Sequence, residues 1–503
     1  MLWKSGVAPR FRLHPRTPMP EDALMSEEDD ARVPDVRALL ARAMDAIDDW
    51  EAGWADYDPH PSLGVAPERL DAAMGAYLDR LTADPEGQAP GNYPFFHPRY
   101  AGQMLKPPHP VATAAYAAAQ RINPNNHALD GGPPTGQMEQ EVIGDLAAML
   151  GLPSEALGHL TGGGTVANLE ALWVARELAA PRQKIAVSEA AHYTHSRMAG
   201  VLGVETLALP TDDAGRMDLG ALEDALADGA VGTVVATPGT TGRGAVDPLS
   251  EIVPLCRRYG ARLHADAAYG GFFALLSGED AVAPEGFPKA PFRALAACDS
   301  VAIDPHKHGL QPYGCGAVLF RDPDVGRFYQ HDSPYTYFTS DALHLGEISL
   351  ECSRAGAAAG ALWLTLRCLP LEARDGLGPV LGACLRAARR WATRIEASGA
   401  LRLLSAPETD ILCFFPEPRA ATLSAVDRAS RRVFDRLMAS DDDPVFLSLY
   451  RVSAETLRAH FPDLEADQEE AAVLRSVLMK PEHENEVERL HGRVAEACRA
   501  VRS

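Results

Sequence analysis

The sequence predicts an α/β protein in which a mostly parallel sheet, covered by helices on both faces, is followed by a smaller α+β domain. Between Gly158 and Ile303, short apolar runs alternate with helical patterns, which is the order typical of parallel sheets. Beyond Pro370, amphipathic helical patterns are mixed with a few short strand patterns. At 503 residues the chain is long enough for two or three domains.

The composition excludes several classes of protein. Apolar residues make up 46% and charged residues 23%, which is ordinary for a globular chain. The formal net charge of −22 disfavours nucleic acid and anionic membranes as partners. No apolar run is long enough to span a bilayer, and the N-terminal stretch lacks the apolar core of a secretory signal. The eight cysteines form no CxxC pair, so we expect a cytoplasmic protein without a metal site or disulfide framework.

The predicted domains follow these patterns along the chain. Residues 1–32 are rich in proline and charge, and we expect a disordered tail there. Residues 33–110 are expected to form an N-terminal helical segment, with helices at Pro34–Trp50 and Glu68–Leu81 and an irregular aromatic stretch after them. The large domain is expected to span residues 111–368 and the small C-terminal domain residues 369–503.

Within the large domain, periodicity predicts strands at Lys184–Val187, Thr206–Leu209, Val231–Thr237, Arg262–Asp266 and Ser300–Ile303. The predicted helices between them are Val166–Leu178, Tyr193–Leu202, Leu219–Leu226 and Leu249–Tyr259. An Ala-rich helix is expected at Ile348–Leu366. In the C-terminal domain we expect helices at Pro379–Ser398, Ala425–Ser440 and Glu484–Val501, and strands at Leu401–Leu404, Asp410–Phe415 and Val445–Val452.

The stretch Asp299–Phe320 contains a candidate catalytic lysine, Lys307, close to the end of a predicted buried strand. It contains an apolar strand, then Asp-Pro-His-Lys-His, then a glycine- and proline-rich turn and a second apolar strand. A lysine in such a poorly solvated place, beside histidines, is suited to act as a nucleophile. The alternative is a surface lysine in a connecting loop, which is what most lysines are.

Other candidates also follow strand ends, where ligands bind in open α/β sheets. The loop Leu160–Thr165 carries three glycines before a helix and is suited to bind phosphate, unless it is simply a tight turn. Asp266 closes a buried strand and needs a cationic partner, or else caps the next helix. His192 could stack on a ring or be a surface histidine, and Thr241 follows a strand on a turn that such residues also favour.

Together these residues provide a phosphate cradle, a stacking ring, an acid for a ring nitrogen and an amine for an imine bond. Pyridoxal phosphate requires that set, namely a lysine, a partner for its pyridine nitrogen and an anion site. The combination is much more specific than any single member.

The chain from Pro94 to Phe415 resembles the group II pyridoxal-phosphate-dependent amino-acid decarboxylases, which include aromatic, tyrosine, glutamate and diaminobutyrate decarboxylases. The resemblance rests on HPRYAGQM, LTGGGTVANLEAL, AAHYTHSRMAG, PGTTGRGAVDPL, HADAAYGGFF and DPHKHGLQPYGCGAVLF. It implies the fold type I architecture of aspartate aminotransferase, with a seven-stranded sheet in the large domain. It also implies a homodimer with the active site at the interface, where the N-terminal helical segment packs on the partner.

The resemblance further implies roles for individual residues. Lys307 corresponds to the lysine that bonds to the cofactor aldehyde, and Asp266 to the acid that keeps the ring nitrogen protonated. His192 corresponds to the stacking residue that also orients the substrate carboxylate and is a second candidate proton donor to Cα. The implied cofactor-binding residues are Gly164, Thr165, His192, Thr241, Asp266, Ala268, His306 and Lys307.

A second group of implied residues concerns the substrate. Members of the family carry a loop tyrosine that returns a proton to the substrate Cα atom, and both Tyr335 and Tyr337 fit its distance from the lysine. The stretch Phe328–Thr339 around them is long and aromatic enough to be a lid. His97, Gln103 and Arg354 are the candidate substrate-side residues.

The implied reaction is decarboxylation of an L-amino acid to its amine, with an aromatic amino acid such as tyrosine as the expected substrate. An acidic amino acid, glutamate or aspartate, is the alternative, because Gln103 lies in a motif similar to that of the glutamate decarboxylases. Other reactions on this fold are those of an aldehyde synthase, a carbon–carbon lyase, a cysteine desulfurase or an aminotransferase. A non-catalytic binding protein is disfavoured by the intact Lys307, Asp266 and His192.

Overall fold

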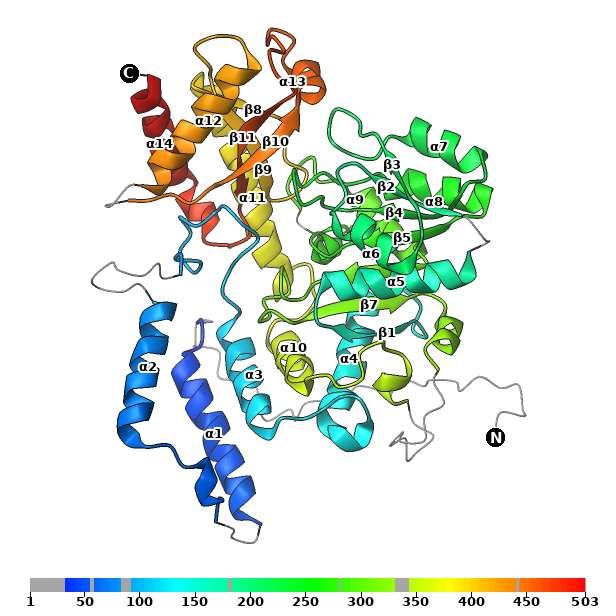
Figure 1. Ribbon diagram of the computed structural model, residues 1–503, viewed down its shortest axis with the longest axis vertical. Coiled ribbons are helices and arrows are strands. Elements are labelled where there is room, and N and C mark those ends of the chain that lie inside the picture. Colours follow the sequence, from blue (N-terminus) through cyan, green and yellow to red (C-terminus); the bar gives the residue numbers. More distant parts are fainter. Residues whose placement is uncertain are drawn as a thin grey trace. The chain divides into compact units, whose positions relative to one another are not determined.

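The computed structural model describes residues 32–54, 58–82, 92–179, 183–279, 281, 283–330, 343–439 and 443–502. The chain divides into two compact units. The first comprises Pro108–Gly382 with the N-terminal residues up to Leu40, and the second comprises Ala41–Pro107 with Ala383–Ser503. Each unit contains one sheet (Figure 1). Among the described helices, none combines the length and the apolar character needed to cross a membrane.

The first unit contains a seven-stranded sheet in the order β1-β7-β6-β5-β4-β2-β3. Strand β7 is antiparallel to both of its neighbours, and all other neighbouring pairs are parallel. The prediction of a mostly parallel seven-stranded sheet is therefore confirmed. The strands are β1 (Leu157–Thr161), β2 (Lys184–Ser188), β3 (Thr206–Leu209), β4 (Val231–Ala236), β5 (Arg262–Asp266), β6 (Ser300–Ile303) and β7 (Gly316–Phe320).

Helices cover this sheet, whose central strands are buried along nearly their whole length. Helix α5 packs across β5, β6 and β7, where Ala171 and Val174 contact Val318 and Phe320 in one apolar cluster. Helix α8 packs on β4 and β5. The helices of this unit are α3 (Pro110–Ile122), α4 (Pro133–Met149), α5 (Gly164–Leu178), α6 (Thr194–Leu202), α7 (Leu219–Ala227), α8 (Leu249–Tyr259), α9 (Lys289–Arg293) and α10 (Gly356–Cys368).

Helix α10 begins eight residues later than the sequence pattern predicts. The predicted start, Ile348, lies after a short 3₁₀ turn (Leu345–Glu347) in irregular chain. The backbone of Arg354 bonds to Asn126 N–H and to the Asn125 side chain, and Ala355 pairs with Asn125 in an isolated bridge. These tertiary contacts hold the segment extended, although its composition favours a helix.

The parallel strands β1, β2, β4, β5 and β6 end at the same edge of the sheet. This follows from the register, since β7 is antiparallel to both β1 and β6. The loops that leave these ends therefore converge on one region.

The second unit contains an antiparallel sheet in the order β10-β11-β9-β8. Its strands are β8 (Leu401–Leu403), β9 (Ile411–Pro416), β10 (Ser448–Ser453) and β11 (Glu470–Val477). Alternate residues of β9 belong to two different apolar clusters, Phe414 to one and Phe415 to the other, so both faces of this sheet are covered. The helices are α11 (Leu377–Ser398, which begins in the first unit), α12 (Leu423–Met438), α13 (Ala454–His460) and α14 (His483–Arg502).

The N-terminal helices occur where the sequence predicts them. They are α1 (Val36–Ala52) and α2 (Pro67–Leu81), joined by a chain that includes a 3₁₀ turn at Pro61–Leu63. Helix α2 contains no buried residue, although it carries several large apolar side chains.

Candidate active site

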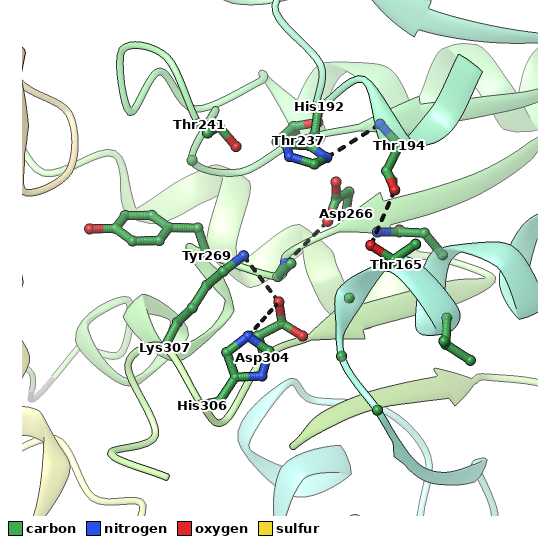
Figure 2. Close-up of a pocket in the computed structure, with 17 residues that line it drawn as sticks. Thr165, His192, Thr194, Thr237, Thr241, Asp266, Tyr269, Asp304, His306 and Lys307 are labelled. Atoms are coloured by element: carbon green, nitrogen blue, oxygen red, sulfur yellow. Dashed lines mark hydrogen bonds and ion pairs between the residues drawn. The ribbon is translucent and has the colours of Figure 1, made fainter. Parts of the chain in front are cut away.

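A cavity of about 310 Å³ lies at the edge of the larger sheet where the parallel strands end (Figure 2). Its volume falls at the lower end of the roughly 300–1,000 Å³ typical of ligand pockets. All eight residues that the sequence assigned to a cofactor line this one cavity, although they come from five separate loops: Gly164, Thr165, His192, Thr241, Asp266, Ala268, His306 and Lys307.

The glycine loop between β1 and α5 forms one wall of the cavity. Gly163 adopts φ +144°, a conformation that few other residues adopt, and its carbonyl accepts the amides of Val166 and Ala167. A Cβ atom on Gly164 would lie 2.8 Å from Asp304 Oδ2, so a glycine is needed there for close packing. The first amides of a helix have no acceptor within it and favour an anion. This wall is therefore suited to bind a phosphate group.

Lys307 lies on the loop after β6 and is paired with Asp304. Lys307 Nζ lies 3.0 Å from Asp304 Oδ2, and the two side chains are 20% and 3% exposed. His306 Nε2 lies 3.6 Å from the same oxygen, while its Nδ1–H donates to the Cys315 carbonyl at 2.8 Å. Asp304 thus holds the lysine amine at the cavity wall. Asp304 was not among the residues predicted from the sequence, although it stands three residues before the lysine.

Asp266, at the end of β5, is a buried carboxylate that faces the cavity. It is 5% exposed, its Oδ2 lies 2.7 Å from His195 Nε2, and its Oδ1 accepts the Ala268 amide at 3.3 Å. Burial by itself raises the pKa of Asp266, but the hydrogen bond from His195 and the nearby positive charge of Lys307 oppose it, and the pKa is held below its usual value. The carboxylate therefore stays ionised and can pair with a cation in the cavity.

Thr194 contacts both His192 and Thr165. His192 Nδ1 accepts the Thr194 amide at 3.3 Å, and the Thr194 hydroxyl lies 3.4 Å from that of Thr165. Burial lowers the pKa of His192, so its imidazole is neutral near pH 7. In Figure 2, His192 and Lys307 project into the cavity from different loops, with Asp266 between them in this view. A neutral, flat ring in this position is suited to stack on an aromatic ligand.

These donors fit the pyridoxal phosphate that the sequence resemblance implies. The helix end at Gly164 offers amides for the phosphate, Asp266 offers a negative charge for a protonated ring nitrogen, and Lys307 offers an amine for the aldehyde. Ala268 keeps the wall beside them small.

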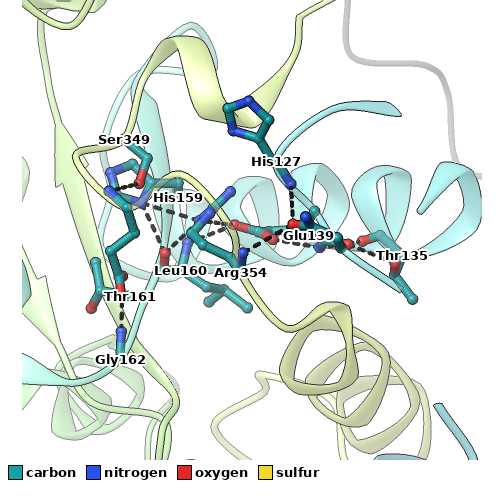
Figure 3. A network of polar contacts seen from close by, with 12 residues as sticks. His127, Thr135, Glu139, His159, Leu160, Thr161, Gly162, Ser349 and Arg354 are labelled. Atoms are coloured by element: carbon teal, nitrogen blue, oxygen red, sulfur yellow. Dashed lines mark hydrogen bonds and ion pairs between the residues drawn. The ribbon is translucent and has the colours of Figure 1, made fainter. Parts of the chain in front are cut away.

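Arg354 does not line the cavity, because a buried network holds it elsewhere (Figure 3). Its Nη1 donates to Glu139 Oε1 at 2.8 Å and to the Leu160 carbonyl at 2.6 Å, and Glu139 in turn accepts the Leu160 amide. Nearby, Glu351 accepts the Gly162 amide at 3.3 Å. These contacts bring Arg354 to the end of β1 and the glycine loop, and we infer that it supports that loop instead of contacting substrate.

Arg354→Met is expected to lower the free energy of unfolding by about 3–5 kcal/mol, because it leaves the Glu139 carboxylate buried without its cationic partner. The two side chains are only 7% and 3% exposed. Denaturant unfolding measures the loss. Arg258→Met removes an arginine from an exposed pair, with side chains 67% and 43% exposed, and should cost less than about 1 kcal/mol. Equal losses for the two variants would contradict the assignment.

The remaining predicted residues are not brought to this cavity by the described structure. His97 and Gln103 belong to the second unit. Tyr335 and Tyr337, with most of the expected lid, lie outside the described residues. Their roles stay predictions.

Comparison with known proteins gives a consistent result. The family model described as "Pyridoxal-dependent decarboxylase conserved domain" matches residues 96–416. A probable L-tyrosine/L-aspartate decarboxylase of Methanothrix thermoacetophila is 32% identical over 302 residues, covering 60% of this chain and 73% of that protein. The L-tyrosine decarboxylase of Enterococcus faecium is 29% identical over 449 residues, covering 69% and 73%. Among solved structures, TDC of Oryza sativa with PLP and tryptamine matches with a TM-score of 0.71 and 20% identity, covering 92% of this chain and 98% of that one.

Proposed function

The chain belongs to the pyridoxal-dependent decarboxylase family, and from this premise we propose that it converts an aromatic L-amino acid, with tyrosine as the first candidate, to its amine and carbon dioxide. The chain is thus a pyridoxal-phosphate-dependent amino-acid decarboxylase. The proposed substrate is supported by the relatives named as tyrosine decarboxylases. Aspartate is the second candidate, because other relatives are named as L-aspartate decarboxylases.

The observation that carries this proposal is the grouping of Lys307, Asp266 and His192 around one cavity. Pyridoxal phosphate, when bound, accepts the electron pair that remains on Cα when the carboxylate leaves as carbon dioxide. In our proposal Lys307 would hold the cofactor, because it offers a primary amine at the cavity wall for the cofactor aldehyde. Asp304 holds the Lys307 amine beside the glycine loop.

The other residues orient and shield the reacting groups in this proposal. The ionised Asp266 keeps a positive charge on the ring nitrogen, which favours loss of the carboxylate. The neutral His192 would offer its flat ring to the cofactor and help to orient the substrate carboxylate. Gly164 and Thr165 bind the phosphate through the start of α5, so that the ring is held in one orientation.

The experiment that tests the substrate is a panel of L-amino acids incubated with the pure protein and pyridoxal phosphate. If the first candidate is correct, carbon dioxide and amine should form with tyrosine. If the second candidate is correct, they should form with aspartate instead. Formation of ammonia, sulfide or a keto acid instead would contradict decarboxylation.

The proton that replaces carbon dioxide on Cα is proposed to come from Tyr335 or Tyr337. One of these tyrosines is expected to act as the general acid. Its replacement by phenylalanine should slow turnover by roughly 10²–10⁴-fold, the range for loss of a general acid. It should also raise the yield of aldehyde by-product, because the unprotonated carbon remains exposed to side reactions. The measurement is the amine-to-aldehyde ratio for Tyr335→Phe and Tyr337→Phe. If neither variant changes the rate or the ratio, the loop has no part in the reaction.

We also propose that the chain acts as a homodimer in which residues 33–110 pack on the partner subunit. The support is helix α2, where Leu70, Met74, Tyr77 and Leu78 are each about half exposed. Exposed apolar patches of this kind mark interaction surfaces. Sedimentation analysis of the pure protein tests the state, and a monomer at micromolar concentration would contradict it.

A further inference from the structure

His195 contacts Asp266 but is not among the residues that line the cavity. It belongs to helix α6, three residues after His192, and is 1% exposed. Its Nε2 lies 2.7 Å from Asp266 Oδ2, which makes it the closest charged or polar side-chain partner of that carboxylate among the described residues. His195 itself does not line the cavity, whereas Asp266 does. Asp266 is the cavity residue to which His195 is hydrogen-bonded, so an effect of His195 on the reaction is expected to act mainly through that carboxylate.

The hydrogen-bond pattern determines which nitrogen of His195 carries its proton. A carboxylate can only accept, so the proton of this bond must lie on Nε2. Nδ1 is buried and has no hydrogen-bond partner among the described residues, so a second proton there would be an unsatisfied buried donor. The neutral tautomer with the proton on Nε2 therefore fits the site best. In that form His195 is a fixed donor that cannot turn without losing its bond.

Asp266 is the carboxylate that contacts His195, while the other carboxylate of the cavity wall, Asp304, is paired with Lys307. His264, on β5, lies with its ring 6.4 Å from that of His195, and burial lowers its pKa to about 3, so it is neutral. The His264 ring is held by Asn168 and Ser300. On the cavity side, the positive charge of Lys307 favours the ionised form of Asp266 and the neutral form of His192.

A buried carboxylate without donors tends to take up a proton, because burial disfavours the charged form. His195 opposes this with a charge-assisted bond to Oδ2, while the Ala268 amide bonds to Oδ1 at a longer 3.3 Å. The two donors also fix the plane of the carboxylate. Oδ1 retains acceptor capacity toward the cavity, since each carboxylate oxygen has two lone pairs.

We propose that His195 is a positioning residue that keeps Asp266 ionised and oriented, and through it keeps the cofactor ring nitrogen protonated during decarboxylation. This inference rests on the proposed function, because it requires pyridoxal phosphate to bind with its ring nitrogen at Asp266. In this proposal, the Nε2–H group of His195 is the hydrogen-bond donor that supports the Asp266 carboxylate.

The test compares His195→Phe, which removes the donor, with His195→Gln, which keeps an N–H at similar reach. Each protein is loaded with pyridoxal phosphate labelled with ¹⁵N in the ring, and the ring-nitrogen NMR shift is measured together with kcat and KM. His159→Phe is the matched control. His159 is equally buried and pairs with Glu170 at 2.9 Å, away from Asp266.

We expect His195→Phe to move the ring-nitrogen shift toward the unprotonated value and to lower kcat roughly ten- to hundredfold, as loss of a charge-assisted bond does. KM should change less than kcat. His195→Gln should restore most of the ring-nitrogen shift and most of kcat. The ring-nitrogen shift of His159→Phe should equal that of the wild type, even if the variant is less stable.

Two other outcomes separate the possible failures. If the ring nitrogen is protonated in the wild type and stays so in His195→Phe, His195 has only a packing role and the inference is wrong. If the wild type binds no pyridoxal phosphate, or binds it with no protonated ring nitrogen, the assignment of Asp266 fails first.

Discussion

Lys307→Ala is expected to abolish decarboxylation, with kcat lowered by about 10⁴-fold, the loss typical of disabling an essential catalytic side chain. Lys307 is the one lysine among the residues that line the cavity of the described structure, and its amine lies at the end of β6 beside Asp304. Without that amine, none of the described side chains lining the cavity offers a primary amine that could bond to the cofactor aldehyde. The variant should also lack the visible absorbance that this bond gives to bound pyridoxal phosphate.

A second variant separates loss of chemistry from loss of charge. Lys307→Ala leaves the buried Asp304 without its cation, whereas Lys307→Arg keeps a positive charge there but cannot bond to the aldehyde. Both should be inactive, and only the alanine variant should lose stability. Lys184→Ala, at a side chain that is 38% exposed, is the control and should keep wild-type activity. Turnover by Lys307→Ala at the wild-type rate would overturn the assignment of this lysine.

The larger sheet could be predicted from sequence because buried parallel strands appear as short apolar runs. The predicted bounds of Thr206–Leu209, Arg262–Asp266 and Ser300–Ile303 are those of β3, β5 and β6. Strand β11 was missed, although it is a central strand of the smaller sheet. Its sequence, EAAVLRSV, begins with an acid and two alanines and lacks the alternation of a half-buried strand, because both of its faces are covered.

Only those residues of the candidate site that follow the ends of strands could be predicted from the sequence. Lys307, Asp266 and the glycine loop follow strands, so the sheet topology brings them to one edge. His195 could not be found in this way, since it lies inside a helix and meets Asp266 only after α6 packs on the sheet. The sequence shows His192 and His195 three residues apart, but it does not show what either ring faces. For the same reason Arg354 was interpreted as a substrate-side residue, whereas its partner is Glu139, 215 positions away.

Asp266→Asn is expected to lower kcat by roughly 10²–10³-fold, the range for loss of one preorganised electrostatic group in an active site. The substitution keeps the shape of the side chain and removes its charge. A neutral amide cannot hold a positive ring nitrogen in a buried site, so the cofactor loses its capacity to accept electrons from Cα. Cofactor binding should weaken less than kcat, because the substitution leaves Lys307 and the proposed phosphate site at Gly164 intact. The measurement is kcat together with the amount of bound pyridoxal phosphate.

The control for this variant is Asp228→Asn, at an exposed carboxylate in the residue that follows the last turn of α7. It should keep kcat within about threefold of the wild type, as surface substitutions away from special contacts do. The double variant, Asp266→Asn with His195→Phe, tests whether His195 acts through Asp266. If His195 acts only through Asp266, the double variant should be no slower than Asp266→Asn alone, because residues that act as one unit are not additive. A double variant slower by the product of the two single effects would mean that His195 influences the reaction by another route.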